Sequence, residues 1–470
     1  MRISKILLFV GLSAIIAAGC KHRPGAPVRK AQTFRSDSVI LKNPVIPGYF
    51  ANPCIIGYEG KYYLYTTIDP WGGYELAVWE SDDLYEWIFR GINWPSKTVC
   101  TSPNSSEYLV GHASVVRTED DRFFMFVTVG SEIWAGTSDH PLGPWYNLLQ
   151  SERPLIRASH EQGIRNSGAE CFIDPEQGAF LYWTEYDDQG RRRCRAGKLM
   201  AEMNSFTEEP VSLMVPDYYG TPYIMKHGGR YFMLYSQGNY VESQYRLRYA
   251  YSDTPLGPWI SKDYGILNTD PSGTPIIGPG YPSVLNLRDR HYLFYQVNDP
   301  SDDHILRRQI CMNELIFDTA NCIVPVVAGK DVIIAAKNEL KSRADLHITD
   351  CSSRISEDYP PENAVDGNFG SIWIPASDDV EPTLIIDLGE RRKIMTVYMW
   401  MEYSILIYRY LIEYSSDGKH WKVFSDQRAN MDNGAPRFDV RSVRTRYLRI
   451  SFPKGELHFY RPAIWEIKVE

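Results

Sequence analysis

The sequence lacks three features that would each point to a familiar class of protein. Lysine and arginine number 50 against 58 aspartate and glutamate residues, so the formal net charge is −8 and no basic footprint for nucleic acid is present. No CxxC pair suggests a zinc site. Beyond the N-terminus, no apolar run is long enough for a transmembrane helix. These absences argue against a nucleic-acid-binding protein, a zinc-motif protein and a protein that crosses the membrane repeatedly.

The first twenty residues have the pattern of a secretory signal. Basic Arg2 and Lys5 precede an apolar run from Ile6 to Ala18, and the small residues AAG stand directly before Cys20. This cleavage region resembles the lipobox of bacterial lipoproteins, which implies that Cys20 is the lipidated first residue of a cell-envelope protein held on the outer membrane, at its periplasmic or surface face. A plain signal peptide with an incidental cysteine is the alternative. Residues 21–38 are basic and contain proline, as expected of a tether.

The remaining seven cysteines are an odd number for an oxidising compartment. At least one thiol is therefore expected to stay free. Cys311 and Cys322 are the favoured local bridge, although the sequence by itself does not determine which cysteines pair.

The chain is organised around a strand–turn–strand pattern that occurs five times. The first copy runs from Phe50 to Thr67, and every copy places an aromatic residue near the start of its second strand. These aromatic anchors recur at intervals of 61, 57, 51 and 61 residues: Tyr62, Phe123, Phe180, Tyr231 and Tyr292. Radially repeated small sheets have such a period, so we predict an all-β chain with a five-bladed β-propeller of four-stranded blades over residues 39–337. Unrelated hairpins that share aromatic strands by propensity are the alternative.

A second repeat agrees with the first. The sequence PLGPW occurs at Pro141–Trp145 and again at Pro255–Trp259, two blade periods later. Both copies fall where the outer strand of a blade is expected to turn.

The period changes after residue 337, where short alternating strands are separated by Gly and Asp turns. We predict a β-sandwich over residues 338–470 that folds independently of the propeller. Its order of motifs resembles the discoidin, or coagulation factor 5/8 C-type, domain, which is also carbohydrate-binding module family 32. The resemblance implies a sugar-binding jelly roll with Trp373 and Trp421 in its core and a structural calcium possible at Asp366. The candidate rim residues are His458, Phe459, Tyr460 and Arg461.

The residues expected to carry chemistry form one ring at the mouth of the propeller, where each inner strand begins. The first residues of the five inner strands are Asn52, His112, Gly168, Thr221 and Tyr281. The exits of the second strands add Asp69, Trp71, Glu132, Trp134, Glu185, Asp187, Gln237, Asn239, Gln296 and Asn298. Carboxylates, amides and tryptophans in one ring favour a sugar site over a phosphate or metal site. Taken singly, each is more simply interpreted as an ordinary solvated loop residue.

Residues 43–327 resemble glycoside hydrolase family 43. The matching features are the opening NPVIPG, the stretch SDDLYEW from Ser81, both PLGPW turns, and FID followed by FLYW around Phe172 and Phe180. The resemblance implies inverting hydrolysis of plant-type glycans such as arabinofuranosides, xylosides or galactosides, with no cofactor required. An inverting enzyme needs an acid and a base roughly 6.5–9.5 Å apart, so that a water molecule fits beside the sugar.

The chain departs from that family at all three catalytic positions. The resemblance places the base Asp at Asn52, the supporting Asp at Gly168 and the acid Glu at Gly220. An amide does not accept a proton as a carboxylate does, and glycine has no side chain. The usual mechanism is therefore not expected at the usual positions.

Two explanations remain, and we predict the first. Carboxylates elsewhere on the mouth do the catalysis, with Glu170, Glu185 and Asp69 as catalytic candidates, Asp217 nearby, and Asn52, Trp71, His112, Thr221 and Tyr281 as substrate-binding residues. In the alternative, the propeller binds glycan without hydrolysing it, and Glu170 is a polar link between inner strands. Two carboxylates facing each other across the mouth would favour the enzyme, and one or none would favour the binder. Under both explanations, the expected partners are an oligo- or polysaccharide and a membrane, which the protein contacts through its lipid anchor.

Overall fold

The structure is a computed structural model, and it describes residues 38–470 except 71–72, 74, 105–108, 150–151, 240–241, 243, 269–276, 299–306, 327, 330, 336–345 and 454–460. The predicted signal segment with Cys20, the tether up to residue 37, Trp71 and the rim residues His458, Phe459 and Tyr460 lie outside this part. Apart from one short 3₁₀ helix, its regular elements are β-strands. None of the described helices is long and apolar enough to span a membrane.

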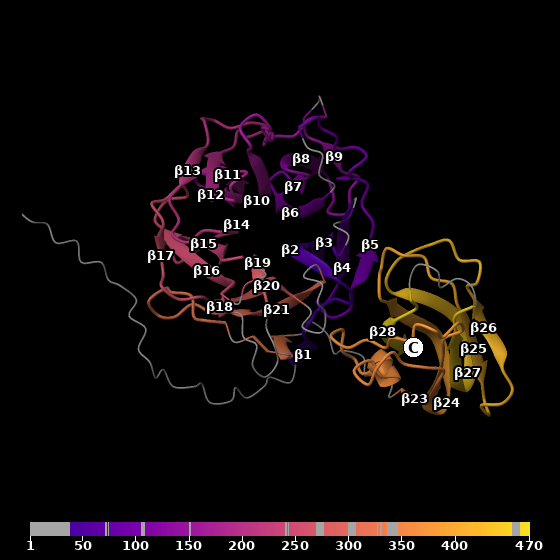
Figure 1. The fold of residues 1–470 in the computed structure, drawn as a ribbon. Helices are drawn as coiled ribbons and strands as arrows, with labels where there is room; N and C mark the ends of the chain where they lie inside the picture. Colours follow the sequence, from indigo (N-terminus) through magenta and orange to yellow (C-terminus); the bar gives the residue numbers. More distant parts are fainter. Residues whose placement is uncertain are drawn as a thin grey trace, which may run out of the picture.

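Five antiparallel sheets surround a common axis, and Figure 1 shows them as a ring. The first two sheets are β2(Phe50–Tyr58), β3(Lys61–Ile68), β4(Leu76–Ser81), β5(Ile88–Arg90) and β6(Val110–Arg117), β7(Phe123–Val129), β8(Glu132–Ser138), β9(Tyr146–Asn147). The next two are β10(Arg165–Asp174), β11(Gly178–Tyr186), β12(Arg192–Lys198), β13(Val211–Leu213) and β14(Gly220–His227), β15(Arg230–Gln237), β16(Arg246–Ser252), β17(Ile260–Ser261), with β18(Leu267–Asn268) added. The predicted five-bladed β-propeller is confirmed.

The fifth blade differs from the prediction of four strands. Its sheet contains β19(Gly280–Leu287), β20(Arg290–Asn298) and β21(Arg308–Leu315). The strand that follows, β22(Asp331–Ala335), pairs instead with the first strand of the chain, β1(Ser38–Lys42), in a separate two-stranded sheet. The two ends of the propeller are thereby joined by backbone hydrogen bonds, which closes the ring.

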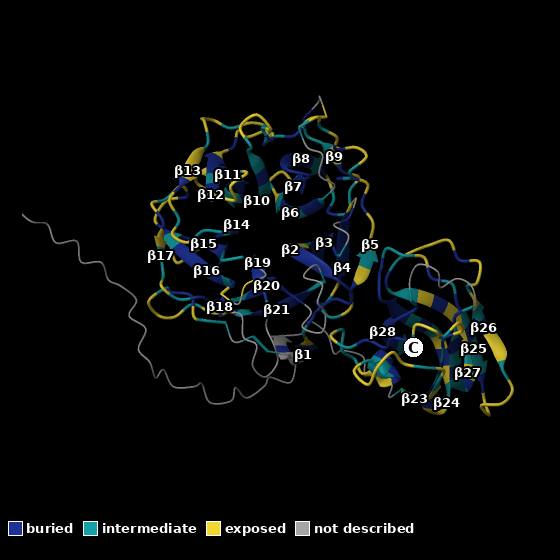
Figure 2. Cartoon of the chain, in the orientation of Figure 1, coloured by how far each residue is buried: buried dark blue, intermediate teal, exposed yellow. Residues whose placement is uncertain are grey.

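The aromatic anchors lie where the repeat places them, near the start of the second strand of each blade. These strands are buried along most of their length, and Figure 2 shows them in dark blue. The two PLGPW turns are equivalent as well, because Tyr65 and Tyr182 of the preceding blades donate to the carbonyls of Pro141 and Pro255, both at 2.7 Å. The repeated residues are therefore packing and docking elements of the blades.

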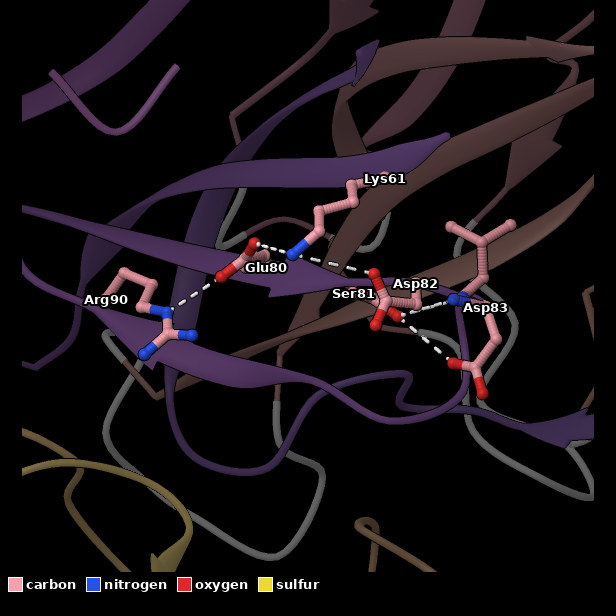
Figure 3. A network of polar contacts seen from close by, with 7 residues as sticks. Lys61, Glu80, Ser81, Asp82, Asp83 and Arg90 are labelled. Atoms are coloured by element: carbon pink, nitrogen blue, oxygen red, sulfur yellow. Dashed lines mark hydrogen bonds and ion pairs between the residues drawn. The ribbon is translucent and has the colours of Figure 1, made fainter. Parts of the chain in front are cut away.

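The SDDLYEW stretch is also structural. Figure 3 shows that Ser81 and Asp83 bond to each other and to the backbone of this turn, while Glu80 pairs with Lys61 at 2.7 Å and Arg90 at 2.8 Å. Trp87 is buried beneath the turn. This motif stabilises the first blade on its outer side and contributes nothing to the axis.

The C-terminal part is the predicted β-sandwich. Its sheet has the strand order β23(His347–Cys351), β24(Thr383–Met401), β27(Arg437–Ser451), β25(Leu411–Ser415), β26(Lys422–Asp426), with β28(Ile464–Val469) against β24 and the 3₁₀ helix η1(Pro361–Val365). Trp373 is buried in the core as predicted. The prediction for Trp421 is wrong, because its ring is partly exposed beneath the Arg449 guanidinium, 4.5 Å from the ring centre.

The sandwich and the first blade share an apolar cluster, which argues against independent folding. Tyr49 contacts Trp465 and Tyr403 with ring centres 5.4 and 5.8 Å apart. The N–H of Phe89 donates to the carbonyl of Ala435 at 2.7 Å. These residues belong to or pack against one continuous cluster that also contains core side chains of both domains. The sandwich also has a core of its own, so it is attached to the propeller by a second set of buried contacts.

The expected bridge between Cys311 and Cys322 is wrong. Cys311 carries a free thiol that is buried in the fifth blade. Its neighbours there are apolar, and burial raises the pKa of this thiol to about 12. Cys311 is therefore a small hydrophobic core residue, which is common for free cysteines.

Candidate functional site

The five inner strands all begin at one end of the axis, which we call the mouth. Each inner strand carries a β-bulge close to its start, where its hydrogen-bonded pairing with the second strand of the blade is interrupted. At each bulge one residue has a left-handed backbone, with φ from +53° to +61°; these bulge residues are Asn52, His112, Gly168, Thr221 and Tyr281. They line a single cavity of about 40 Å³, the mouth cavity. The predicted ring of first residues thus comes together.

Left-handed backbone is unfavourable for L-residues, by roughly 1–2 kcal/mol, and four of the five bulge residues are not glycine. The conformation is held by the preceding blade. Thr67 accepts the N–H of His112 at 3.2 Å, Thr128 accepts that of Gly168 at 3.0 Å, and Thr184 accepts that of Thr221 at 3.1 Å. Gln296 does the same for Asn52 at 3.0 Å, from the last blade to the first. Strain repeated in several blades and supported by matching contacts indicates a site whose geometry matters.

A second set of hydrogen bonds between blades lies further along the inner strands, beyond the bulge residues. Ser283 accepts the N–H of Ile55 at 3.1 Å, and Ser114 accepts that of Cys171 at 3.0 Å. Glu170 occupies the equivalent position in its blade, two residues after the bulge. Its carboxyl group bonds to the N–H of Ile224 and to the hydroxyl of Ser114. Glu170 therefore makes the same inter-blade link that a serine makes elsewhere.

Glu170 also forms part of the floor of the mouth cavity. On its other side begins a larger axial cavity of about 620 Å³, which opens at the opposite end of the propeller. Burial raises the pKa of Glu170, and the hydrogen bonds to Ser114 and Ile224 offset only part of this effect. The resulting pKa is about 8. The carboxyl group is consequently mostly protonated at neutral pH. A cavity of about 40 Å³ admits water but is too small for a sugar ring.

The other two catalytic candidates lie elsewhere. Both carboxylate oxygens of Asp69 accept from Arg308, at 2.8 and 2.9 Å, and both side chains are nearly buried. Glu185 pairs with Arg193 at 2.7 Å, its direct neighbour across strands β11 and β12. Neither Asp69 nor Glu185 lines the mouth cavity. Among the residues that the structure describes, Glu170 is thus the single carboxylate on its wall.

The positions of the three departures have different surroundings, and only Gly168 is tightly enclosed. Asn52 donates to Thr67 at 2.7 Å, and its carbonyl oxygen is buried without a described partner. A Cβ on Gly168 would lie 3.2 Å from the Thr221 methyl group. A Cβ on Gly220 would lie 3.4 Å from the Thr184 hydroxyl and 3.9 Å from the Arg192 guanidinium. An arginine therefore stands beside the position at which the resemblance places the acid.

Sequence reasoning missed Arg192. Its guanidinium lies over the Tyr219 ring at 4.2 Å and near the Tyr186 ring at 5.1 Å. It belongs to a run of three arginines at the start of β12, and strand alternation sends Arg192 and Arg193 to opposite faces. That alternation is the signal that sequence reasoning could have used.

His112 is the other titratable group of the ring. Burial and, to a lesser extent, the positive charges of Arg308 and Arg192 together lower its pKa to about 3. Its ring packs against Tyr281 with centres 5.0 Å apart, and Nδ1 has no described partner. At neutral pH His112 is therefore an uncharged group that can donate or accept a hydrogen bond in the cavity.

A wider hollow of about 560 Å³ adjoins Gly220, and we call it the blade-4 hollow. Rings, amides and charged groups line it: Asp217, Tyr218, Tyr219, Gln237, Gly238, Gln244, Tyr245, Arg246 and Asn268. Asp217 pairs with Arg248 at 2.6 Å, and Arg246 donates to the Gln237 amide oxygen at 2.6 Å. Aromatic faces next to fixed amides are typical of sugar sites.

The two sandwich predictions can be placed only in part. Arg461 does not extend from a free rim, because both oxygens of the buried Glu402 accept from it at 2.8 and 3.0 Å. The oxygens of Asp366 accept from the Asn368 N–H at 2.9 Å and the Ser371 hydroxyl at 2.6 Å. In the described part of the chain, no three acidic, histidine or cysteine side chains are grouped to hold a metal ion. Calcium is also bound by backbone carbonyl and amide oxygens, so a structural calcium at Asp366 stays a prediction.

The fold and the ring define a five-bladed propeller of the glycoside-hydrolase type with a C-terminal β-sandwich. Residues 41–321 match the family model for glycosyl hydrolases family 43, and residues 347–467 match that for the F5/8 type C domain. The chain therefore belongs to glycosyl hydrolases family 43.

The relatives are hydrolases. A Beta-D-galactofuranosidase xynD of Aspergillus niger is 26% identical over 302 residues, which cover 60% of this chain and 84% of that protein. A Xylosidase/arabinosidase of Bacteroides ovatus is 22% identical over 350 residues, covering 62% and 98%. A solved structure titled glycoside hydrolase has a TM-score of 0.75 at 24% identity and covers 91% of this chain and 99% of its own. That likeness extends through the sandwich and shows the shared fold.

Proposed function

We propose that the propeller mouth, through the blade-4 hollow that adjoins it, recognises a sugar of a plant-type polysaccharide and does not hydrolyse it. The observation that carries this proposal is the state of Glu170. It is the one carboxyl group on the described wall of the mouth cavity, and it is engaged by Ser114 and Ile224 in an inter-blade link. The three positions at which the family resemblance places catalytic carboxylates hold Asn52, Gly168 and Gly220.

The charge around the mouth supports recognition over hydrolysis. Glycoside cleavage passes through a transition state with oxocarbenium character, which nearby carboxylates stabilise. Here Asp69 is neutralised by Arg308, Glu170 is mostly protonated, and Arg192 adds a positive charge. Such surroundings destabilise a developing cation, whereas the rings and amides of the blade-4 hollow still suit a bound sugar.

Hydrolysis by an atypical carboxylate is the second candidate, and one observation favours it. A carboxyl group with a pKa of about 8 carries its proton at neutral pH, as a general acid requires. In that case Glu170 acts as the acid on arabinofuranosides, xylosides or galactosides. The relatives named above, a galactofuranosidase and a xylosidase/arabinosidase, have names that fall in the same substrate classes.

Two measurements on the purified full-length protein separate the candidates. Calorimetric titration with arabino-, xylo- and galacto-oligosaccharides reports binding, and chromatography of the same mixtures reports products. Binding without products supports recognition. Products that disappear in Glu170→Gln and persist in the exposed control Glu176→Gln establish the second candidate. If neither binding nor products are detected, both candidates are contradicted.

We further propose that the protein is anchored in the cell envelope through lipid on Cys20, with the F5/8 type C domain as a second glycan-binding unit. The lipobox-like sequence before Cys20 and the family match of the sandwich support this. Cys20→Ser should release the protein from the membrane fraction in a bacterial host. Equal membrane association of both forms would refute the anchor.

A further inference from the structure

Among the described residues, Arg192 is a cation at the mouth for which no counter-ion is present. In the part of the chain that the structure describes, it makes neither an ion pair nor a hydrogen bond, and its contacts are the faces of Tyr219 and Tyr186. By contrast, its neighbours Arg191 and Arg193 pair with Asp187 and Glu185, both at 2.7 Å. The absence of a partner is therefore particular to the one arginine of the run that points toward the site.

The position of Arg192 is fixed. Stacking on two rings restrains the guanidinium plane and leaves the N–H groups at its edge available, which is the geometry that binds planar or tetrahedral anions in pairs of hydrogen bonds. One of its nitrogens lies 3.9 Å from the point that a Cβ on Gly220 would occupy. Gly220 borders the bulge residue Thr221 and thus the mouth cavity, and Tyr219 belongs to the blade-4 hollow. The guanidinium therefore stands where these two spaces meet.

The neighbouring charges do not cancel that of Arg192. Asp69 neutralises Arg308, and Asp217 neutralises Arg248. Arg246, on the wall of the blade-4 hollow, donates to the amide of Gln237 and has no described carboxylate partner. The described mouth therefore has an excess of positive charge, although the chain as a whole has a net charge of −8.

We propose that the glycan bound at the mouth carries an acidic group, a uronate carboxylate or a sulfate ester, and that Arg192 binds this group. The proposal rests on glycan recognition at the mouth as the proposed function. It adds a substrate class to it: acidic sugar residues are preferred over their neutral counterparts. Arg192 is then the residue that determines specificity, with the sugar ring placed against the tyrosines and amides of the blade-4 hollow.

The experiment compares matched probes with the full-length protein. Trigalacturonate and its carboxyl-reduced galactose counterpart form one pair, and a sulfated galacto-oligosaccharide and its desulfated form make the other. Affinity is measured by calorimetry at low and at high salt. Arg192→Gln is compared with Arg193→Gln, which removes the same charge from the adjacent position of the same strand but on the opposite face.

At least one acidic probe should bind roughly ten-fold or more tightly than its neutral counterpart, because a charge-assisted pair of hydrogen bonds contributes that much. The preference should weaken in high salt and disappear in Arg192→Gln, while Arg193→Gln keeps it. The pair that shows the preference identifies the acidic group. Equal binding of acidic and neutral probes, or equal loss in both variants, would overturn the inference and leave glycan recognition intact. Absence of binding to all four probes would count against both proposals.

Discussion

Asp69 on the first blade holds Arg308 on the last blade through two hydrogen bonds of 2.8 and 2.9 Å, across 239 residues of sequence. The pair lies beside the mouth, and its side chains are 1% and 11% exposed. It joins the first and last blades at the seam where the ring closes, in addition to the strand pair β1–β22.

Asp69→Asn should therefore destabilise the protein by about 3–5 kcal/mol, because the guanidinium of Arg308 would remain buried without its counter-ion. Chemical denaturation measures the change. Asp426→Asn is the matched control, since its partner Arg428 and Asp426 itself are well exposed. A similar loss in both variants would show that the closure of the ring does not depend on the Asp69 pair.

The hydrogen bonds from the bulge residues to the threonines of the preceding blades can be tested with two adjacent residues. Thr67 accepts from the His112 N–H at 3.2 Å and from the Asn52 amide at 2.7 Å, whereas the buried hydroxyl of Thr66 has no described partner. Thr67→Val should cost about 1–3 kcal/mol, since it leaves buried donors unsatisfied. Thr66→Val should be neutral or stabilising. If thermal denaturation ranks the two variants the other way, the bulge residues are not held in place by these threonine hydrogen bonds.

The link made by Glu170 predicts a pH dependence. Its pKa of about 8 in the folded protein exceeds the ordinary value of 4.5, so the folded state binds more protons between these values and stability falls as pH rises through this window. His112, with a pKa of about 3 against 6.5, has the opposite effect but only below about pH 6.5. The decline should therefore be clearest between about pH 6.5 and 8, at no more than about 1.4 kcal/mol per pH unit.

Urea denaturation across that window measures the slope, and Glu170→Gln should remove it. The control Glu176→Gln, an exposed carboxylate of the same blade, should leave it unchanged. Identical slopes in the wild type and in Glu170→Gln would mean that Glu170 is not protonated in the folded state.

The shared apolar cluster predicts that the two domains unfold together. Trp465 is buried at the domain contact, and Trp465→Ala should cost about 3–5 kcal/mol and lower the melting of the whole chain. Differential scanning calorimetry should show one main transition that shifts as a unit. Phe438→Ala, on the exposed surface of the sandwich, is the control. A propeller transition that stays in place while the sandwich melts earlier would restore independent folding.

The sequence by itself determined the repeat and therefore the architecture. An aromatic anchor near the start of every second strand is a local feature, because a strand that is buried on both faces needs large apolar side chains whatever surrounds it. The same period located the five bulge residues at the mouth, since equivalent positions in equivalent blades must converge on the axis. The sequence also has Asn52, Gly168 and Gly220 at the positions where the family resemblance places catalytic carboxylates.

Only the tertiary structure decided what the carboxylates do. Glu185 and Asp69 stand at strand ends near the mouth, but arginines from other strands draw them into ion pairs, and no periodicity reports such partners. Glu170 faces the axis as strand alternation requires, yet its role follows from Ser114 and Ile224 of the neighbouring blades. Arg192 is the opposite case, because within the described part of the chain it has no carboxylate partner, whereas its two neighbours in sequence each have one. Charge pairing depends on distances of a few ångströms, and for Asp69 and Arg308 the partners are 239 residues apart, so this pairing is settled only when the blades pack.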